Sequence, residues 1–135
     1  MELNPYLTFD GNCEEALTFY AGVFGGEITS LMRFSDMPDT EWVTDENKSM
    51  VAHASLQLGD REILASDTGG MSPHKGFSGV TLQTGWPTVE EGKAIFDKLS
   101  EGGKVEMDFA ETFWAKGFGM CRDRFGVGWM VNCDK

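Results

Sequence analysis

The side chains best suited to chemistry in this sequence are its two histidines, His53 and His74, together with the carboxylate of Asp67. His53 lies in a segment where polar and apolar residues alternate, on the polar side of the β-strand that this alternation predicts. An imidazole can exchange a proton near neutral pH, and a carboxylate can orient it, so we take His53 and Asp67 as the candidate catalytic residues. His74 follows Pro73 in a glycine-rich segment, which predicts a linker instead.

Metal sites are built from clusters of ligands at characteristic spacing, and this chain has few suitable residues. It contains two histidines and three cysteines, with no Cys-x-x-Cys spacing. An odd number of cysteines favours neither a disulfide framework nor a zinc knuckle. Cys13 lies on the apolar side of a predicted helix, which predicts a small buried hydrophobic side chain. We therefore expect neither a bound metal nor another cofactor, with a divalent metal as the less favoured alternative.

Composition limits the possible partners. With 135 residues, 41% of them hydrophobic and 24% charged, the chain has the size and composition of one globular domain. Its net charge of −11 argues against nucleic acids and anionic membrane surfaces, which attract basic proteins. The first residues do not resemble a signal peptide, and no segment approaches the ~20 apolar residues of a membrane span. We therefore expect a cytoplasmic protein with no nucleic-acid or membrane partner.

Two segments, residues 12–28 and 88–105, share one plan. Each begins with a residue suited to cap a helix, Asn12 or Thr88, followed by a glutamate at the third helical position, which predicts a capping box. Apolar residues then recur at helical spacing, and each segment closes on a pair of glycines, which commonly end helices. The repeat predicts one structural module that is used twice.

Alternating segments around the two helices predict strands. They are residues 3–9, 27–34, 50–58, 61–67, 77–84, 104–109, 113–122 and 127–133. The order is β-α-β-β-β, twice, which predicts an α+β fold with a curved mixed or antiparallel sheet around a cavity. We expect a single domain, residues 1–135, with modules at about 1–67 and 77–135 and a linker at 68–76. The acidic segment 35–49 is either a solvated loop or a lid with apolar contacts from Met37 and Trp42.

The helix of each module can cover only one face of its sheet, so the other face indicates function. Polar residues recur on that second face in several strands, mixed with aromatic side chains, as is typical of ligand cavities. We predict a site for a small organic molecule. The candidate ligand-binding residues are Asn4, Tyr6, His53, Gln57, Asp67, Gln83, Trp114 and Asn132.

Four runs of residues resemble a known family. They are NPYLTFDGNCEEAL from residue 4, FYAGVFGGEI from residue 19, ETFWAKGFG from residue 111 and DRFGVGWMVN from residue 123. They are similar to the PhnB-like group of the vicinal oxygen chelate superfamily, which includes glyoxalase I, extradiol dioxygenases and the bleomycin- and fosfomycin-resistance proteins. The resemblance implies a glyoxalase-like fold, a homodimer and a divalent metal in the cavity. The metal-ligand positions carried over are Asn4, Ala65, Gly79 and Met130, none of which is a histidine or a carboxylate.

The leading hypothesis is a metal-free member of this group that binds a small organic molecule, as in the bleomycin-resistance branch. The alternative is a metal-dependent isomerase, lyase or dioxygenase in which His53 converges with Asp67 or Asp123. A purely structural or interaction module is a third possibility. Some members of the group carry a ubiquinone-pathway methyltransferase label. We do not extend it to this chain, because S-adenosylmethionine enzymes usually have a doubly wound sheet, which the predicted strand order excludes.

Overall fold

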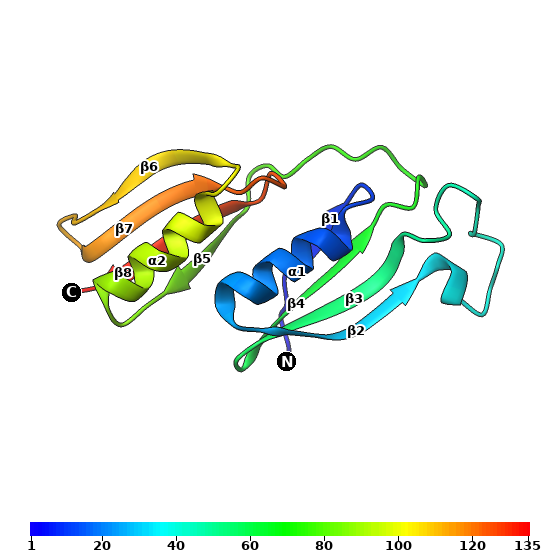
Figure 1. Ribbon diagram of the computed structural model, residues 1–135, viewed down its shortest axis with the longest axis horizontal. Helices are drawn as coiled ribbons and strands as arrows, with labels where there is room; N and C mark the ends of the chain where they lie inside the picture. Colours follow the sequence, from blue (N-terminus) through cyan, green and yellow to red (C-terminus); the bar gives the residue numbers. More distant parts are fainter. The chain divides into compact units, whose positions relative to one another are not determined.

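The computed structural model describes residues 1–135 and contains two compact units, Met1–Lys75 and Gly76–Lys135 (Figure 1). Each unit has the element order β-α-β-β-β, and in each a single helix lies across one face of a four-stranded sheet. The predicted α+β class and the tandem order of elements are confirmed. Met1–Lys75 is called unit 1 and Gly76–Lys135 unit 2.

Unit 1 begins with the short strand β1. Its elements are β1 (Tyr6–Phe9), α1 (Cys13–Phe24), β2 (Glu27–Arg33), the 3-10 turn η1 (Phe34–Asp36), β3 (Val51–Leu58) and β4 (Arg61–Asp67). The strands lie in the order β1-β4-β3-β2, with β1 parallel to β4 and the other pairs antiparallel. Leu17 and Tyr20 of α1 are fully buried, as are Ala54 and Leu56 of β3, so the core lies between helix and sheet.

Unit 2 repeats this arrangement. Its elements are β5 (Thr81–Gly85), α2 (Val89–Ser100), β6 (Lys104–Ala110), β7 (Ala115–Arg122) and β8 (Gly128–Asp134). The strand order is β5-β8-β7-β6, again with one parallel pair, β5 and β8. Leu99 of α2 and Val131 of β8 are fully buried, and Trp129 is 2% exposed, so this unit also has its own core under its helix.

The two helices begin differently, although the sequence predicts the same capping box for both. At α2 the prediction is confirmed for the cap residue, because Thr88 Oγ1 accepts a hydrogen bond from Glu91 N at 3.1 Å. At α1 the prediction is wrong, because the side chain of Asn12 makes no capping hydrogen bond. The backbone of Asn12 (φ −116°, ψ 25°) is outside the extended region that N-cap residues normally adopt. The carboxylate of Asp67, the last residue of β4, accepts hydrogen bonds at the start of this helix instead.

The paired glycines have separate roles. Gly25 ends α1 with a φ of 72°, a left-handed conformation that favours glycine. Gly26 has no such conformation, but a Cβ atom at this position would lie 2.6 Å from the carbonyl oxygen of Gln57. A Cβ at Gly103 of unit 2 would collide in the same way with the carbonyl oxygen of Arg122. The second glycine of each pair therefore allows the strand after the helix to approach its neighbour.

Strands β1 and β5 begin three or more residues later than predicted. Strand β1 begins at Tyr6 and not at residue 3, since the preceding Pro5 has no N–H to donate to a partner strand. Strand β5 begins at Thr81 and not at residue 77, because Gly79 has a φ of +77°, which interrupts an extended chain. These differences shorten the sheets at their ends without changing their order.

The acidic segment 35–49 is fastened to the rest of unit 1 by one buried side chain. Asn47 is 1% exposed, and its Nδ2 donates hydrogen bonds to Trp42 O at 2.9 Å and Gly69 O at 3.0 Å. Its Oδ1 accepts a hydrogen bond from Thr44 N at 2.7 Å. Asn47 therefore attaches this segment to the chain that follows β4.

Candidate functional site

The side chains of unit 1 that point away from α1 form a surface that we call the helix-free face of unit 1. It includes Tyr6 and Thr8 of β1 and His53, Ser55 and Gln57 of β3, because these residues alternate with the buried core positions. The register places Tyr6 and Ser55 on either side of Leu64. Hydroxyl, imidazole, amide and aromatic groups thus share one face, as the sequence predicts.

Tyr6 and His53 contact each other across this face. The phenol oxygen of Tyr6 lies 3.2 Å from Nδ1 of His53, and the ring centroids are 5.8 Å apart. The hydrogen bond couples the phenol to the imidazole tautomer. When Tyr6 donates to Nδ1, Nε2 of His53 carries the proton and can donate to a ligand; when Nδ1 donates, Nε2 can accept. Since Tyr6 is 48% exposed, a small molecule can reach the pair.

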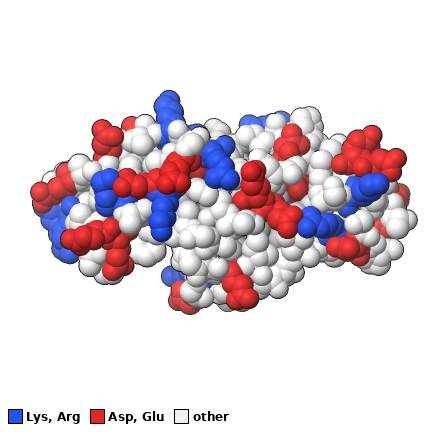
Figure 2. All heavy atoms as spheres, in the orientation of Figure 1, with Lys and Arg blue, Asp and Glu red and all other residues white.

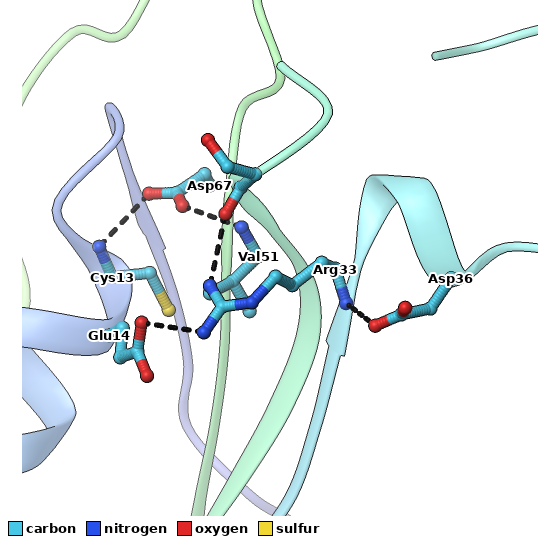
Figure 3. Close-up of polar contacts among 7 residues, drawn as sticks. Cys13, Glu14, Arg33, Asp36, Val51 and Asp67 are labelled. Atoms are coloured by element: carbon cyan, nitrogen blue, oxygen red, sulfur yellow. Dashed lines mark hydrogen bonds and ion pairs between the residues drawn. The ribbon is translucent and has the colours of Figure 1, made fainter.

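Asp67 lies on the opposite side of the sheet from His53. Its Oδ1 accepts a hydrogen bond from Gly11 N at 2.8 Å. Figure 3 shows two more, from Cys13 N to Oδ1 at 3.0 Å and from Val51 N to Oδ2 at 2.9 Å. The residue is 4% exposed. The carboxylate therefore binds the start of α1 and the start of β3, and the predicted pairing of Asp67 with His53 is not formed.

Arg33 adds a second connection near the start of α1, visible in Figure 3. Its Nη2 lies 2.9 Å from Glu14 Oε1, and its Nη1 donates to the carbonyl oxygen of Ser49 at 3.0 Å. Its backbone N–H donates to Asp36 Oδ2 at 2.9 Å. This arginine therefore links α1 and β2 to the segment that precedes β3, a position that gives it a structural role.

Cys13 lies beside the Asp67 carboxylate and is fully buried, which confirms the predicted hydrophobic position. Burial, together with the negative charges of Asp67 and Glu14, raises the pKa of its thiol to about 12. Burial also raises the pKa of the Cys121 and Cys133 thiols. Since the thiolate is the nucleophile and the metal ligand, these cysteines are not suited to either role at neutral pH.

The helix-free face of unit 2 differs in chemistry from that of unit 1. Register places Gln83, Met130, Met120 and Met107 in one row across β5, β8, β7 and β6. Asn132 and Phe118 are paired in the next row. The ring of Trp114 packs edge-on against Phe118 at 5.3 Å, and Phe113 packs edge-on against Trp114 at 4.8 Å.

Asn132 has one satisfied and one unsatisfied amide atom. Its Nδ2 donates to Asp134 Oδ1 at 2.7 Å, whereas its Oδ1 is buried and has no hydrogen-bond partner. The sequence singles out Gln83, Trp114 and Asn132 but does not include Met107 or Met120 among the candidate residues. Alternation along β7 is the signal that could have found Met120, because Phe118 and Met120 share one side of that strand. Around Met107, register shifts on both sides interrupt the alternation of β6.

The other residues predicted to bind a ligand or a metal lie away from the Tyr6–His53 contact or make contacts of their own. Asn4 is half-buried and precedes β1, and Gln57 Nε2 donates to Gly59 O at 2.8 Å across its own hairpin. Ala65, one of the positions carried over from the superfamily, is fully buried on the helix side of β4. The carboxylate of Asp123 is 3% exposed and accepts hydrogen bonds from Phe125 N, Val127 N and Trp129 Nε1. No group of three or more His, Cys, Asp or Glu side chains is arranged to hold a metal ion.

Comparison with known proteins gives consistent matches over the whole chain. Residues 1–132 match the family model described as 3-demethylubiquinone-9 3-methyltransferase. Protein YjdN of Escherichia coli strain K12 is 40% identical over 143 residues, which cover 100% of this chain and 97% of that protein. The crystal structure of protein PA1353 from Pseudomonas aeruginosa is 39% identical, with a TM-score of 0.92, and covers 99% of this chain and 98% of its own.

Two further structures support the resemblance seen in the sequence. A PhnB protein from Bacillus cereus is 26% identical with a TM-score of 0.83, and the match covers 98% of this chain and 99% of that one. A glyoxylase/bleomycin resistance protein/dioxygenase domain from Frankia is 13% identical with a TM-score of 0.72, covering 100% of this chain and 92% of its own. The second likeness concerns the fold alone. The predicted resemblance to the PhnB-like group and its superfamily is confirmed.

Neither helix is long and apolar enough to cross a membrane.

Proposed function

This chain belongs to the family described as 3-demethylubiquinone-9 3-methyltransferase, and from that premise we propose that it binds a small organic molecule on the helix-free faces of its sheets without a metal ion. The family description names a methyl transfer, which in S-adenosylmethionine enzymes usually takes place on a doubly wound parallel sheet with a glycine-rich first turn. Each sheet here has a single parallel strand pair, and both sheets have a helix on one face only. The sheets of this chain therefore differ from the architecture on which that methyl transfer usually takes place.

The observation that carries the proposal is the contact of Tyr6 with His53 at 3.2 Å. These residues come from strands β1 and β3, which are separated by β4, and both point away from the core. A polar pair on an outer face adds little to folding, because its groups could bond to water instead. A pair that is oriented in advance is useful for recognising a ligand, since less freedom is lost on binding.

The donor chemistry of these faces supports binding without a metal. Zinc and similar ions require several imidazole, thiolate or carboxylate ligands, and calcium or magnesium requires several oxygens. The helix-free face of unit 1 offers one imidazole, and that of unit 2 offers thioethers and amides. The alternative, a metal-dependent isomerase, lyase or dioxygenase, needs Asp67 or Asp123 beside His53. Both carboxylates accept hydrogen bonds from backbone groups in buried positions.

One experiment tests the proposal in two arms. The first arm is elemental analysis of tag-free protein, combined with thermal unfolding in the presence of Ni, Zn, Mn, Mg and Fe salts and of a chelator. We expect less than stoichiometric metal and no change in Tm with the chelator. A stoichiometric metal, lost together with stability on chelation, would overturn the metal-free proposal, because a ligand of the native state stabilises it by mass action.

The second arm is a screen of small aromatic and oxygen-rich metabolites by thermal shift. Compounds that raise the Tm of the wild type should do so less in His53→Ala and Tyr6→Phe. The matched control is His74→Gln, because His74 is the other histidine of the chain and lies in the segment after β4, where its Nε2 contacts the backbone oxygen of Thr8. Equal effects in all three variants would argue against this site.

The proposal includes the functional unit expected from the sequence, in which residues 1–135 act as one domain, as a homodimer and in the cytoplasm. The family resemblance supports the homodimer, and the acidic composition agrees with a partner that is neither a nucleic acid nor a membrane. Light scattering coupled to size-exclusion chromatography measures the oligomeric state directly.

A further inference from the structure

We infer that the ligand is a neutral, planar aromatic molecule with an N–H or O–H donor, and that it binds on the helix-free face of unit 2 by donating a hydrogen bond to Asn132 Oδ1. This inference rests on the proposed function and specifies the ligand class and the subsite. It concerns the surface formed by Gln83, Trp114, Phe118, Met120, Met130 and Asn132.

Asp134 fixes the orientation of the Asn132 amide. A carboxylate oxygen of Asp134 lies 2.7 Å from Nδ2 of Asn132, and an ionised carboxylate can only accept hydrogen bonds. The NH₂ group must therefore face Asp134, and the amide oxygen must face the other way. That oxygen is buried and has no partner. Since more than nine in ten buried polar groups have a partner, the site lacks a hydrogen-bond donor.

Aromatic and methionine side chains form the surface beside this acceptor. Phe118 is the register partner of Asn132, and the ring of Trp114 packs against it at an interplanar angle of 67°. Met120 and Met130 are paired with each other in the adjoining row. Aromatic rings contact further rings in offset or edge-on geometry, and thioethers adapt to the shape of what they touch. An aromatic ring lying on this surface would bring its donor group to Asn132.

The charge around this surface limits the ligand. The six side chains that form this surface are aromatic, thioether or amide groups, and the Asp134 carboxylate lies at its edge, 2.7 Å from Asn132 Nδ2. An anion would be repelled by Asp134, and a cation would be attracted to Asp134 and away from Asn132 Oδ1, which faces the other way. The net charge of −11 further disfavours anions. A neutral heteroaromatic compound fits these properties.

The test compares indole with 1-methylindole and benzofuran, which are similar in shape but have no N–H donor. Binding is measured on the full chain by NMR of ¹³C-methyl-labelled methionines. We expect saturable shifts of the Met120 and Met130 methyl signals, with indole binding about tenfold more tightly than the other probes, as an added hydrogen bond to a buried acceptor provides. The Met71 methyl, in the segment after β4, should not shift.

Two variants separate the hydrogen bond from the surface. Asn132→Leu should weaken indole binding to the level of benzofuran without changing benzofuran binding. Asp134→Ala removes the partner of Nδ2 that orients the amide, so the preference for indole should decrease while benzofuran binding stays unchanged. Equal affinity of the wild type for all three probes, or a preference that survives in Asn132→Leu, would overturn the inference. The wild-type comparison remains decisive even if the leucine variant does not fold.

The experiment also distinguishes the inference from the proposed function. If no probe shifts the methionine signals while other compounds bind through His53 and Tyr6, the inference fails and the proposed function stands. If no small molecule binds at either face, both fail.

Discussion

The carboxylate of Asp67 accepts hydrogen bonds from three backbone N–H groups in two parts of unit 1, the start of α1 and the start of β3. Gly11 precedes α1, Cys13 begins it, and Val51 begins β3. All three N–H groups would otherwise lack a partner close to the core, where an unsatisfied donor is costly. Asp67 thus performs the capping that Asn12 does not. It also joins that cap to the sheet.

We predict that Asp67→Asn lowers the free energy of unfolding by about 2–4 kcal/mol, because an amide has one acceptor oxygen and would direct an NH₂ group at a backbone donor. Urea denaturation followed by circular dichroism measures the change. Asp60→Asn is the matched control, since Asp60 lies on the exposed hairpin between β3 and β4, and little change is expected there. Unchanged stability in Asp67→Asn would show that the buried contacts of the carboxylate contribute little.

The sequence predicts a functional role for Asp67 beside His53, whereas in the structure its partners are backbone N–H groups. The signal for its true position was present, because Ile63, Ala65 and Asp67 alternate along β4 and the first two are buried. A polar residue in such a series must find partners inside the core. The missing partner of Asn132 Oδ1 was not predictable, since it depends on the direction of a side-chain amide in three dimensions.

At the scale of elements, α1 and α2 offer a direct comparison of two ways to begin a helix. Thr88→Ala removes the hydrogen bond from Glu91 N to Thr88 Oγ1 and should cost about 1 kcal/mol of stability, the usual effect of deleting such a cap. Asn12→Ala should cost distinctly less, because the Asn12 side chain makes no capping hydrogen bond. Chemical denaturation of both variants under the same conditions measures the difference. An equal loss of stability in both variants would mean that Asn12 caps α1 as Thr88 caps α2, which is what the sequence repeat predicts.

The order of the elements could be predicted because helical and strand periodicities are properties of the local sequence. The strand ends could not be predicted as well, since they depend on backbone conformation and on partners. The positive φ of Gly79 delays β5, and the register shifts around Met107 change which residues of β6 share a face. The duplicated plan was visible in the glycine pairs, but the close contact of Gly26 with Gln57 is a consequence of strand packing.

At the scale of the whole molecule, the two units share a topology and differ in the chemistry of their helix-free faces. Unit 1 presents a phenol and an imidazole in contact, and unit 2 presents aromatic rings, thioethers and an amide. Each unit also buries one carboxylate: Asp67 supports the start of a helix, whereas Asp123 supports the connection from β7 to β8 and the indole of Trp129. The faces can therefore differ while the cores stay alike, which is how one fold can serve different ligands.

The charge of the molecule leads to a last prediction. The chain has 22 acidic and 11 basic residues, and Figure 2 shows acidic and basic groups interspersed over one face of the molecule. The excess negative charge repels itself in the compact state. Raising NaCl from about 0.01 M to about 0.15 M shortens the Debye length from about 30 Å to about 8 Å. We expect Tm to rise by about 4 °C, because this screening should outweigh the weakening of exposed ion pairs such as Lys93–Asp97.

A charge variant distinguishes this screening from a specific effect of the salt. Glu41 and Asp45 both lie in the exposed acidic segment after η1. The double variant Glu41→Lys with Asp45→Lys therefore makes the net charge less negative without changing the core. The double variant should have a higher Tm at low salt and gain less from added NaCl. The Tm of the variant with the neutral pair Glu41→Gln and Asp45→Asn should lie between those of the double lysine variant and the wild type. The reason is that the repulsion grows with the magnitude of the net negative charge. A Tm that is independent of salt, or the same salt response in all three proteins, would show that the interspersed lysines and arginines already balance the acidic groups locally.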